Sequence, residues 1–100
     1  MSDQTVTVIA RVKAKADKVE QEESALMDLI GPTREEPGCI SYVLHQAADD
    51  KSSFVFVENW ANQMALDEHL QTPYLKAFVD RADELLAEPL DVTLWHQIVR

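Results

Sequence analysis

The fold of this chain is decided by residues 54–70, FVFVENWANQMALDEHL, in which a strand-like pattern passes directly into a helix-like one. The aromatic and β-branched residues at its start favour a strand, and Asn62 is a suitable N-cap for the helix that follows. The strand ends in a carboxylate, an amide and an indole, Glu58, Asn59 and Trp60. The helix adds His69, so most of the reactive side chains, and any functional site, are expected at this junction.

Regular patterns divide the rest of the chain into further strands and helices. Alternation with period two predicts strands over residues 5–13, 39–46, 53–60 and 90–99, and helical spacing predicts helices over residues 17–31, 62–70 and 72–88. The order strand, helix, strand, strand, helix, strand is the split βαβ arrangement of a ferredoxin-like domain. We therefore predict an α+β fold in which helices cover one face of a four-stranded antiparallel sheet.

Local signals predict where these elements begin and end. Asp17 followed by Glu20 resembles a capping box, and Gly31-Pro32 is expected to stop the regular part of the first helix. Residues 48–52 are expected to form a polar loop that joins two strands into a hairpin. Thr72-Pro73 predicts a second helix start, with proline at the first helical position.

Several of the predicted strands are apolar on both sides. Phe54 and Phe56 alternate with Val55 and Val57, and Trp95 opposes further apolar residues in the last strand. An antiparallel sheet with one face in water should alternate apolar with polar residues, so something is expected to cover the second face. A symmetric homodimer would cover it, and a ligand cavity within one subunit is the alternative. A dimer with cavities beside its interface satisfies both.

Composition limits the domain count and the partners. The 100 residues fit one domain, and the net charge of −9 would repel a phosphate backbone, so no nucleic-acid partner is expected. Cys39, the single cysteine, cannot form an intrachain disulfide. The N-terminus lacks signal-peptide features and no stretch reaches the roughly 20 apolar residues of a membrane span, so we expect a cytoplasmic protein with no membrane partner.

The chain resembles the antibiotic biosynthesis monooxygenase (ABM) family, of the quinol monooxygenase type. The resemblance rests on residues 37–42, 56–60, 66–70 and 72–78, and with the element order it covers about residues 5–99. It implies a single ABM-like domain over residues 1–100, with a ferredoxin-like fold and a dimeric α/β-barrel-like assembly. Members that degrade haem have a different pattern, and Ala10, His69 and Val79 at the corresponding positions disfavour haem degradation here.

The resemblance also implies a chemistry. In the oxygenases of this family a phenol or hydroquinone supplies electrons to O2 without a metal or flavin, so no cofactor and no metal are expected. Such a reaction needs an apolar pocket, a base and hydrogen-bond donors for the resulting anion. His69 is the candidate base or proton relay, because its ordinary pKa lies near neutrality. Trp60 and Tyr74 are the other expected catalytic residues, although a tryptophan at a strand end is more often a packing anchor and Tyr74 replaces a histidine found in many relatives.

Five more residues are expected to bind the substrate: His45, Glu58, Asn59, Phe78 and Arg34. Three of them have a structural alternative: His45 could be a satisfied strand histidine, Glu58 could accept a bond from a neighbouring strand or helix end, and Arg34 could pair with the neighbouring Glu35 or Glu36. The three histidines and Cys39 lack short-range metal-ligand spacing.

The expected function is therefore cofactor-independent oxidation of a small aromatic diol, quinol or polyketide-like phenol by O2. Two alternatives stay open at this point: an isomerase of a small signal molecule or sugar phosphate, and a dimeric binding or stress module without catalysis. An isomerase of a sugar phosphate would need basic groups at the pocket mouth, for which Arg34 and Arg11 are the candidates.

Overall fold

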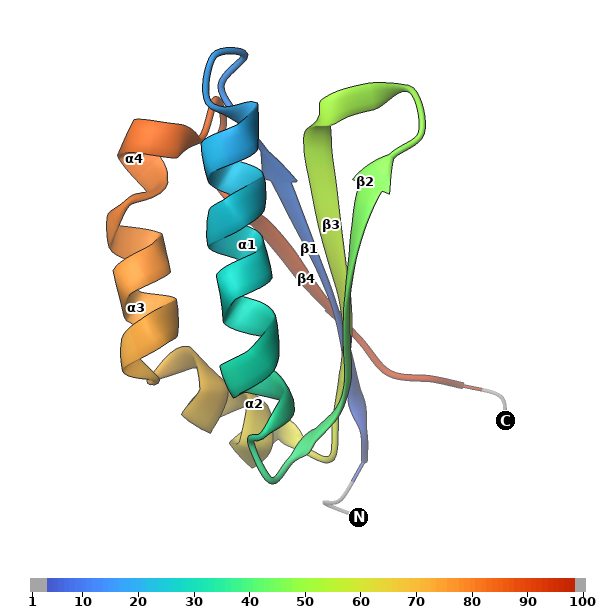
Figure 1. Cartoon of the computed structure of the whole chain (residues 1–100). Helices are drawn as coiled ribbons and strands as arrows, with labels where there is room; N and C mark the ends of the chain where they lie inside the picture. The colour runs from blue at the N-terminus through green and yellow to red at the C-terminus, as the bar shows by residue number, and fades with distance from the viewer. Residues whose placement is uncertain (1–3, 99–100) are drawn as a thin grey trace.

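The computed structural model describes residues 4–98 as one antiparallel sheet with a layer of helices on one side (Figure 1). The elements are β1 (Val6–Lys13), α1 (Val19–Arg34), β2 (Cys39–Ala47), β3 (Asp50–Trp60), α2 (Gln63–Leu70), α3 (Pro73–Asp80), α4 (Ala82–Leu85) and β4 (Asp91–Trp95). The strand order is β2-β3-β1-β4, and every neighbouring pair is antiparallel. The predicted ferredoxin-like α+β fold is confirmed.

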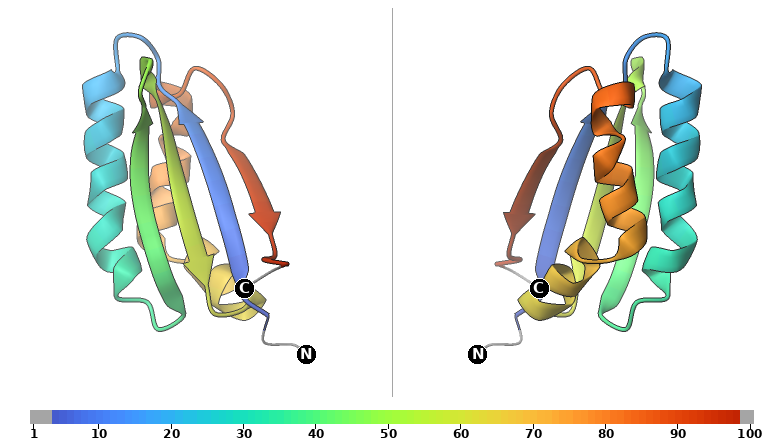
Figure 2. Two further views of the ribbon diagram at one scale, coloured as in Figure 1. Left: turned by 90° about the vertical axis from the view of Figure 1, so that its right-hand side faces the viewer. Right: turned by 90° about the vertical axis from the view of Figure 1, so that its left-hand side faces the viewer.

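The core lies between the sheet and the helices, which cover the same face (Figure 2). Period two along the central strands directs Val6, Val8 and Val12 of β1 toward the helices. Phe54, Phe56 and Trp60 of β3 point the same way. These side chains pack against Leu26 and Leu29 of α1 and against Leu66 of α2, so burial of apolar area on this face stabilises the fold.

The first helix departs from its prediction at both ends. Lys18 is the N-cap and makes no side-chain cap hydrogen bond, so the capping box predicted from Asp17 and Glu20 is wrong. The helix also continues through Pro32 to Arg34. Tertiary contacts explain this extension, because Thr33 is fully buried and Arg34 donates Nε–H and Nη2–H to the Tyr42 carbonyl oxygen at 3.1 and 2.9 Å.

The long helix predicted over residues 72–88 is interrupted at Arg81, which separates α3 from α4. Leu86 leaves the helix in an extended conformation and forms an isolated bridge with Ala14. The Lys15 N–H donates to the Leu85 carbonyl oxygen at 2.8 Å. A residue after β1 therefore binds a backbone carbonyl at the end of α4, where the helix stops. The last strand is shorter than predicted, ending at Trp95, and Val99 lies outside the described residues.

The hairpin and two helix caps are confirmed, with one correction. Asn62 and Thr72 accept hydrogen bonds from the backbone N–H groups of Ala65 and Leu75, as N-caps should. β3 begins at Asp50 rather than at residue 53, so the loop is shorter than the predicted 48–52. The Asp50 carboxylate accepts hydrogen bonds from the side chains of Ser52 and Ser53, which orders this polar stretch within the strand.

The second face of the sheet carries no helix (Figure 2). Ile9, Val57 and Val43 lie in one row across it, and Trp95 of β4 is 55% exposed. We call this surface the open face. Within the described part of the chain, no helix is both long and apolar enough to span a bilayer.

Candidate functional site

A cavity of about 240 Å³ lies between the sheet and the helices. Its floor is formed by the inward side chains of β1, β3 and β4, and its roof by α1, α2 and α3. Nearly all of its lining is apolar, and the exceptions are grouped near α2: Glu58, Gln63, His69 and the Tyr42 ring. A small enclosed volume with a few hydrogen-bonding groups is the usual form of a small-molecule site.

His69 is placed in this cavity by α2. The helix begins at the Asn62 cap and buries Leu66 and His69 on the same side, one turn apart, so the imidazole is only 2% exposed. Its Nδ1 lies 2.9 Å from Oε2 of Glu36, in the loop after α1. With a carboxylate as acceptor, Nδ1 carries the hydrogen, which leaves Nε2 of a neutral ring as the basic nitrogen.

Tyr74 binds the same carboxylate oxygen. Its hydroxyl donates to Glu36 Oε2, so Glu36 accepts from both the tyrosine and the histidine. Burial is the main cause that raises the pKa of the Tyr74 phenol to about 12, and the hydrogen bond to Glu36 adds to it. Tyr74 is therefore a neutral donor at physiological pH rather than a base. It fixes the position of Glu36 and lies outside the cavity lining.

Trp60 packs behind the site. Its side chain is fully buried, its ring centroid lies 4.6 Å from that of His69, and its Nε1–H donates to Oε1 of Glu58 at 2.9 Å. The indole does not line the cavity, but it contacts Glu58 and His69, which do. Trp60 therefore sets the relative positions of His69 and Glu58.

Glu58 is a buried acid in an apolar wall. Desolvation raises the pKa of its carboxyl group from 4.5 to about 7, against the opposing effect of the Trp60 hydrogen bond and with a further increase from Glu36. A substantial fraction of Glu58 is therefore protonated near neutrality, and it can donate as well as accept a hydrogen bond. Burial also raises the pKa of the Tyr42 hydroxyl, whose ring stacks on Phe56 with centroids 4.3 Å apart.

The structure brings together some of the residues predicted for the site and separates others. His69, Glu58 and Phe78 line the cavity. The Arg34 guanidinium donates its hydrogen bonds to the Tyr42 backbone carbonyl instead. His45 and Asn59 are in register with the open-face residues Val55 and Thr7, on the opposite side of the sheet from the cavity.

Two residues at the site were not singled out by the sequence. Glu36 was considered only as a neighbour of Arg34, and Tyr42 only as a strand residue. Glu36 lies 33 positions before His69, and no local periodicity connects them. The only sequence signal for the position of Glu36 was the turn-forming pair Pro37-Gly38. This pair ends the loop that brings the Glu36 carboxylate to α2.

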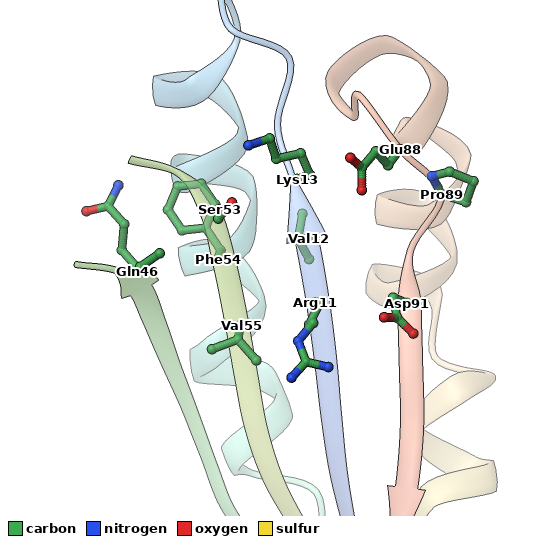
Figure 3. Close-up of a pocket in the computed structure, with 11 residues that line it drawn as sticks. Arg11, Val12, Lys13, Gln46, Ser53, Phe54, Val55, Glu88, Pro89 and Asp91 are labelled. Atoms are coloured by element: carbon green, nitrogen blue, oxygen red, sulfur yellow. The ribbon is translucent and has the colours of Figure 1, made fainter. Parts of the chain in front are cut away.

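A second, larger hollow of about 460 Å³ lies on the open face (Figure 3). Arg11, Asp91, Glu88 and Val55 are among its lining residues, and none of the three histidines lines it. Its charges are mixed and several of its residues are exposed, so it lacks the apolar enclosure of the cavity under the helices. Among residues 4–98, no group of three or more His, Cys, Asp or Glu side chains is arranged to hold a metal ion.

The fold and the site define the class of this protein, a ferredoxin-like domain with an apolar cavity beside a carboxylate-bound histidine, and comparison narrows that class. Residues 5–81 match the model of the family described as antibiotic biosynthesis monooxygenase, and the chain belongs to that family. Rv0793 from Mycobacterium tuberculosis, whose name proposes monooxygenase activity, is 37% identical over 89 residues, which are 89% of this chain and 87% of that protein. The uncharacterised protein sll1783 from Synechocystis is 39% identical over 94 residues. They are 94% of this chain but only 64% of that protein's length.

Solved structures agree with this assignment. The crystal structure of PA3566 from Pseudomonas aeruginosa superposes with a TM-score of 0.92 at 28% identity and covers 99% of both chains. The structure of Rv0793 superposes with a TM-score of 0.91 at 34% identity, covering 96% of this chain and 97% of that one. The match extends over nearly the whole chain, so the backbone that surrounds the cavity is shared with these structures.

Proposed function

We propose that this protein is a cofactor-independent monooxygenase that oxidises a small aromatic diol or related phenol with O2. The observation that carries the proposal is the placement of His69 at the wall of an apolar cavity under the helices, with Nδ1 held by Glu36. This arrangement supplies a base where a phenol would bind and excludes most water, so a phenolate formed there would be strongly reducing.

The proposed reaction balances without another reductant. Nε2 of His69 takes the proton of one hydroxyl group, and the electron-rich phenolate reduces O2. One oxygen atom forms a bond to a ring carbon and the other leaves as water with two hydrogens. The diol loses four electrons in total and becomes a hydroxylated quinone. Glu58, which is partly protonated near neutrality, is placed to donate a hydrogen bond to the developing oxyanion.

Oxygen consumption by metal-free protein with a panel of aromatic diols tests this function. We expect His69→Ala to lower kcat by about 10²- to 10⁴-fold, the range for loss of a general base. Glu36→Gln should give a smaller fall, because the base remains but its tautomer is no longer fixed. Glu68→Ala, an exposed position on the same helix, is the matched control and should retain the wild-type rate.

The opposite results would move the assignment to one of the alternatives. Uptake that His69→Ala leaves unchanged would place the base elsewhere, and no uptake across the panel at matched folding would favour the non-catalytic module. The isomerase of a sugar phosphate has less support, because Arg34 is bound to the Tyr42 carbonyl and Arg11 belongs to the open face.

We also propose that two copies associate through their open faces. The exposed apolar side chains of this surface, including Val43 at 41% and Trp95 at 55%, support a contact of this kind. Light scattering should give twice the mass of one chain. Val57→Lys, which puts a charge in the middle of the face, should give the monomer mass, whereas Glu20→Lys on the outer surface of α1 should not. A monomer mass for the unmodified protein would refute the dimer.

A further inference from the structure

The polar groups of the cavity are confined to one end. The floor consists of rows of side chains that run across the sheet, and Glu58 lies in the row that contains Val8 and Leu94. The next rows toward the C-terminal end of β1 are apolar: Val92, Ala10 and Phe56, and then Val12. In the roof, His69 and Gln63 both come from α2. A ligand therefore finds hydrogen-bonding side chains at the α2 end.

The two buried polar groups at that end lie close together. Trp60 contacts both of them, through a hydrogen bond of 2.9 Å to Glu58 and through a ring centroid distance of 4.6 Å to His69. Each still has one atom without a hydrogen-bond partner among residues 4–98, Oε2 of Glu58 and Nε2 of His69. Because both groups lie at the α2 end of the cavity, they suit a ligand that presents its two hydroxyl groups on one side.

The volume limits the rest of the ligand. An apolar cavity of about 150 Å³ is sufficient for benzene, and pockets for drug-sized ligands begin at about 300 Å³. The cavity of about 240 Å³ lies between these values. It therefore suits one aromatic ring with a short substituent better than three fused rings.

The mouth of the cavity is apolar as well. Four of its lining side chains are about half exposed and mark where it opens between α2, α3 and the edge strand β4: Leu70, Val79, Val92 and Leu94. A hydroxyl group on the outer side of a bound ring would lie between these apolar side chains, away from Glu58 and His69. An apolar substituent in the same place would bury its surface.

We propose that the site takes a one-ring diol whose hydroxyl groups are neighbours, as in catechol, with a short alkyl group on the opposite side of the ring. The proposal rests on the proposed function and specifies its substrate class. A diol with hydroxyl groups at opposite ends of the ring leaves one of them among Val79 and Val92, whichever way it enters. That hydroxyl makes no hydrogen bond to Glu58 or His69, and the loss of this bond should weaken binding by about tenfold.

Calorimetric titration without oxygen tests this preference independently of turnover. The ligands are two isomers of equal size, an ethylcatechol with the ethyl group away from both hydroxyls, and ethylhydroquinone. We expect the catechol to bind the unmodified protein at least about tenfold more tightly. Val92→Thr keeps the side-chain shape and places a hydroxyl at the apolar end. It should therefore strengthen hydroquinone binding several-fold and reduce the ratio of the catechol affinity to the hydroquinone affinity. Val57→Thr, the same change on the open face, should leave the ratio unchanged.

Admitting oxygen afterwards separates this inference from the proposed function. Selective catechol binding without oxygen uptake would support the ligand class and overturn the monooxygenase. Uptake with equal affinity for the two isomers would support the monooxygenase and overturn the ligand class. A ratio that Val92→Thr does not change would also overturn the proposed orientation, and the absence of binding by either isomer would overturn the ligand class outright.

Discussion

The two faces of the same sheet carry similar strand residues in different surroundings. On the helix-covered face, one row contains Val8 and Glu58, and the carboxyl group of Glu58 is buried with its pKa raised to about 7. The adjacent row on the open face contains Thr7 and Asn59, and Asn59 is satisfied by Thr7 and Ser41. The comparison teaches that the covering layer, rather than the strands, shifts the pKa of a polar side chain.

The largest expected difference between the two faces is in the free energy of unfolding after removal of one tryptophan from each face. Trp60→Ala should lower the free energy of unfolding by about 3–5 kcal/mol, because it empties a fully buried position and leaves Glu58 without its donor. Trp95→Ala should change the monomer by no more than about 0.5 kcal/mol. Urea unfolding followed by circular dichroism measures both. A Trp95→Ala cost that grows with protein concentration would indicate that the open face is covered by a second copy.

The two glycines give the next largest contrast. A Cβ at Gly38 would lie 2.2 Å from Cβ of Ala65 on α2, so Gly38→Ala should force the loop and helix apart and cost about 1–3 kcal/mol. Gly31 has open space around it within α1, and Gly31→Ala should stabilise by about 0.5–1 kcal/mol. Thermal unfolding of both variants should therefore give shifts of opposite sign, and a shift of the same sign would contradict the close approach of α2.

Buried acids on the covered face should make stability depend on pH. Glu22 of α1 is fully buried, its carboxyl oxygens have no hydrogen-bond partner among residues 4–98, and burial raises its pKa from 4.5 to about 7 despite an opposing effect from Arg81. Between these values the folded protein holds a proton that the unfolded chain has released. The contribution of Glu22 to the free energy of unfolding is therefore fully present below about pH 4.5. It decreases between about pH 4.5 and pH 7, by about 1.4 kcal/mol per pH unit.

Glu22→Met should remove this contribution. We expect the variant to be more stable than the unmodified protein by roughly 1–3 kcal/mol at pH 8 and to gain less at pH 5. Glu20→Met, at an exposed position of the same helix, should show no such difference between the two pH values. Equal gains for Glu22→Met at both pH values would mean that Glu22 does not hold its proton in the folded protein.

The smallest expected effect lies on the open face. Thr7 donates to Oδ1 of Asn59 at 2.6 Å between half-buried groups, and Thr7→Val should cost less than about 1 kcal/mol in the monomer because water can replace the lost donor. Chemical denaturation of the monomer measures it. A loss well above that value would show that this polar row is protected from water and would remove the contrast with Glu58.

Local chemistry was sufficient to predict much of the fold. Asn62 and Thr72 are confirmed as caps because an N-cap needs only its own side chain and the next turn. The two-sided apolar pattern of the strands correctly separated the residues that face the helices from those of the open face. Alternation along residues 39–46 predicts Ile40 on the same side of the strand as Tyr42, and this prediction is wrong, because a register shift between Cys39 and Ser41 leaves Ile40 59% exposed.

The remaining features depend on contacts between distant residues. The end of the helical segment at Leu85 follows from hydrogen bonds to the segment after β1, and the extension of α1 follows from the bond between Arg34 and Tyr42. In the site, the burial of His69 was predictable from its spacing to Leu66. Its partner Glu36 was not, because the loop geometry that joins them has no periodic signature.

The two tryptophans give each face its own optical probe. Trp60 is fully buried against His69, one contact away from the cavity, whereas Trp95 is more than half exposed on the open face. Their emission should therefore differ in wavelength, that of Trp60 at the blue side and that of Trp95 at the red side. A ligand in the cavity would change the first signal and association of two copies would change the second, so the unlabelled protein can report both events separately in one spectrum.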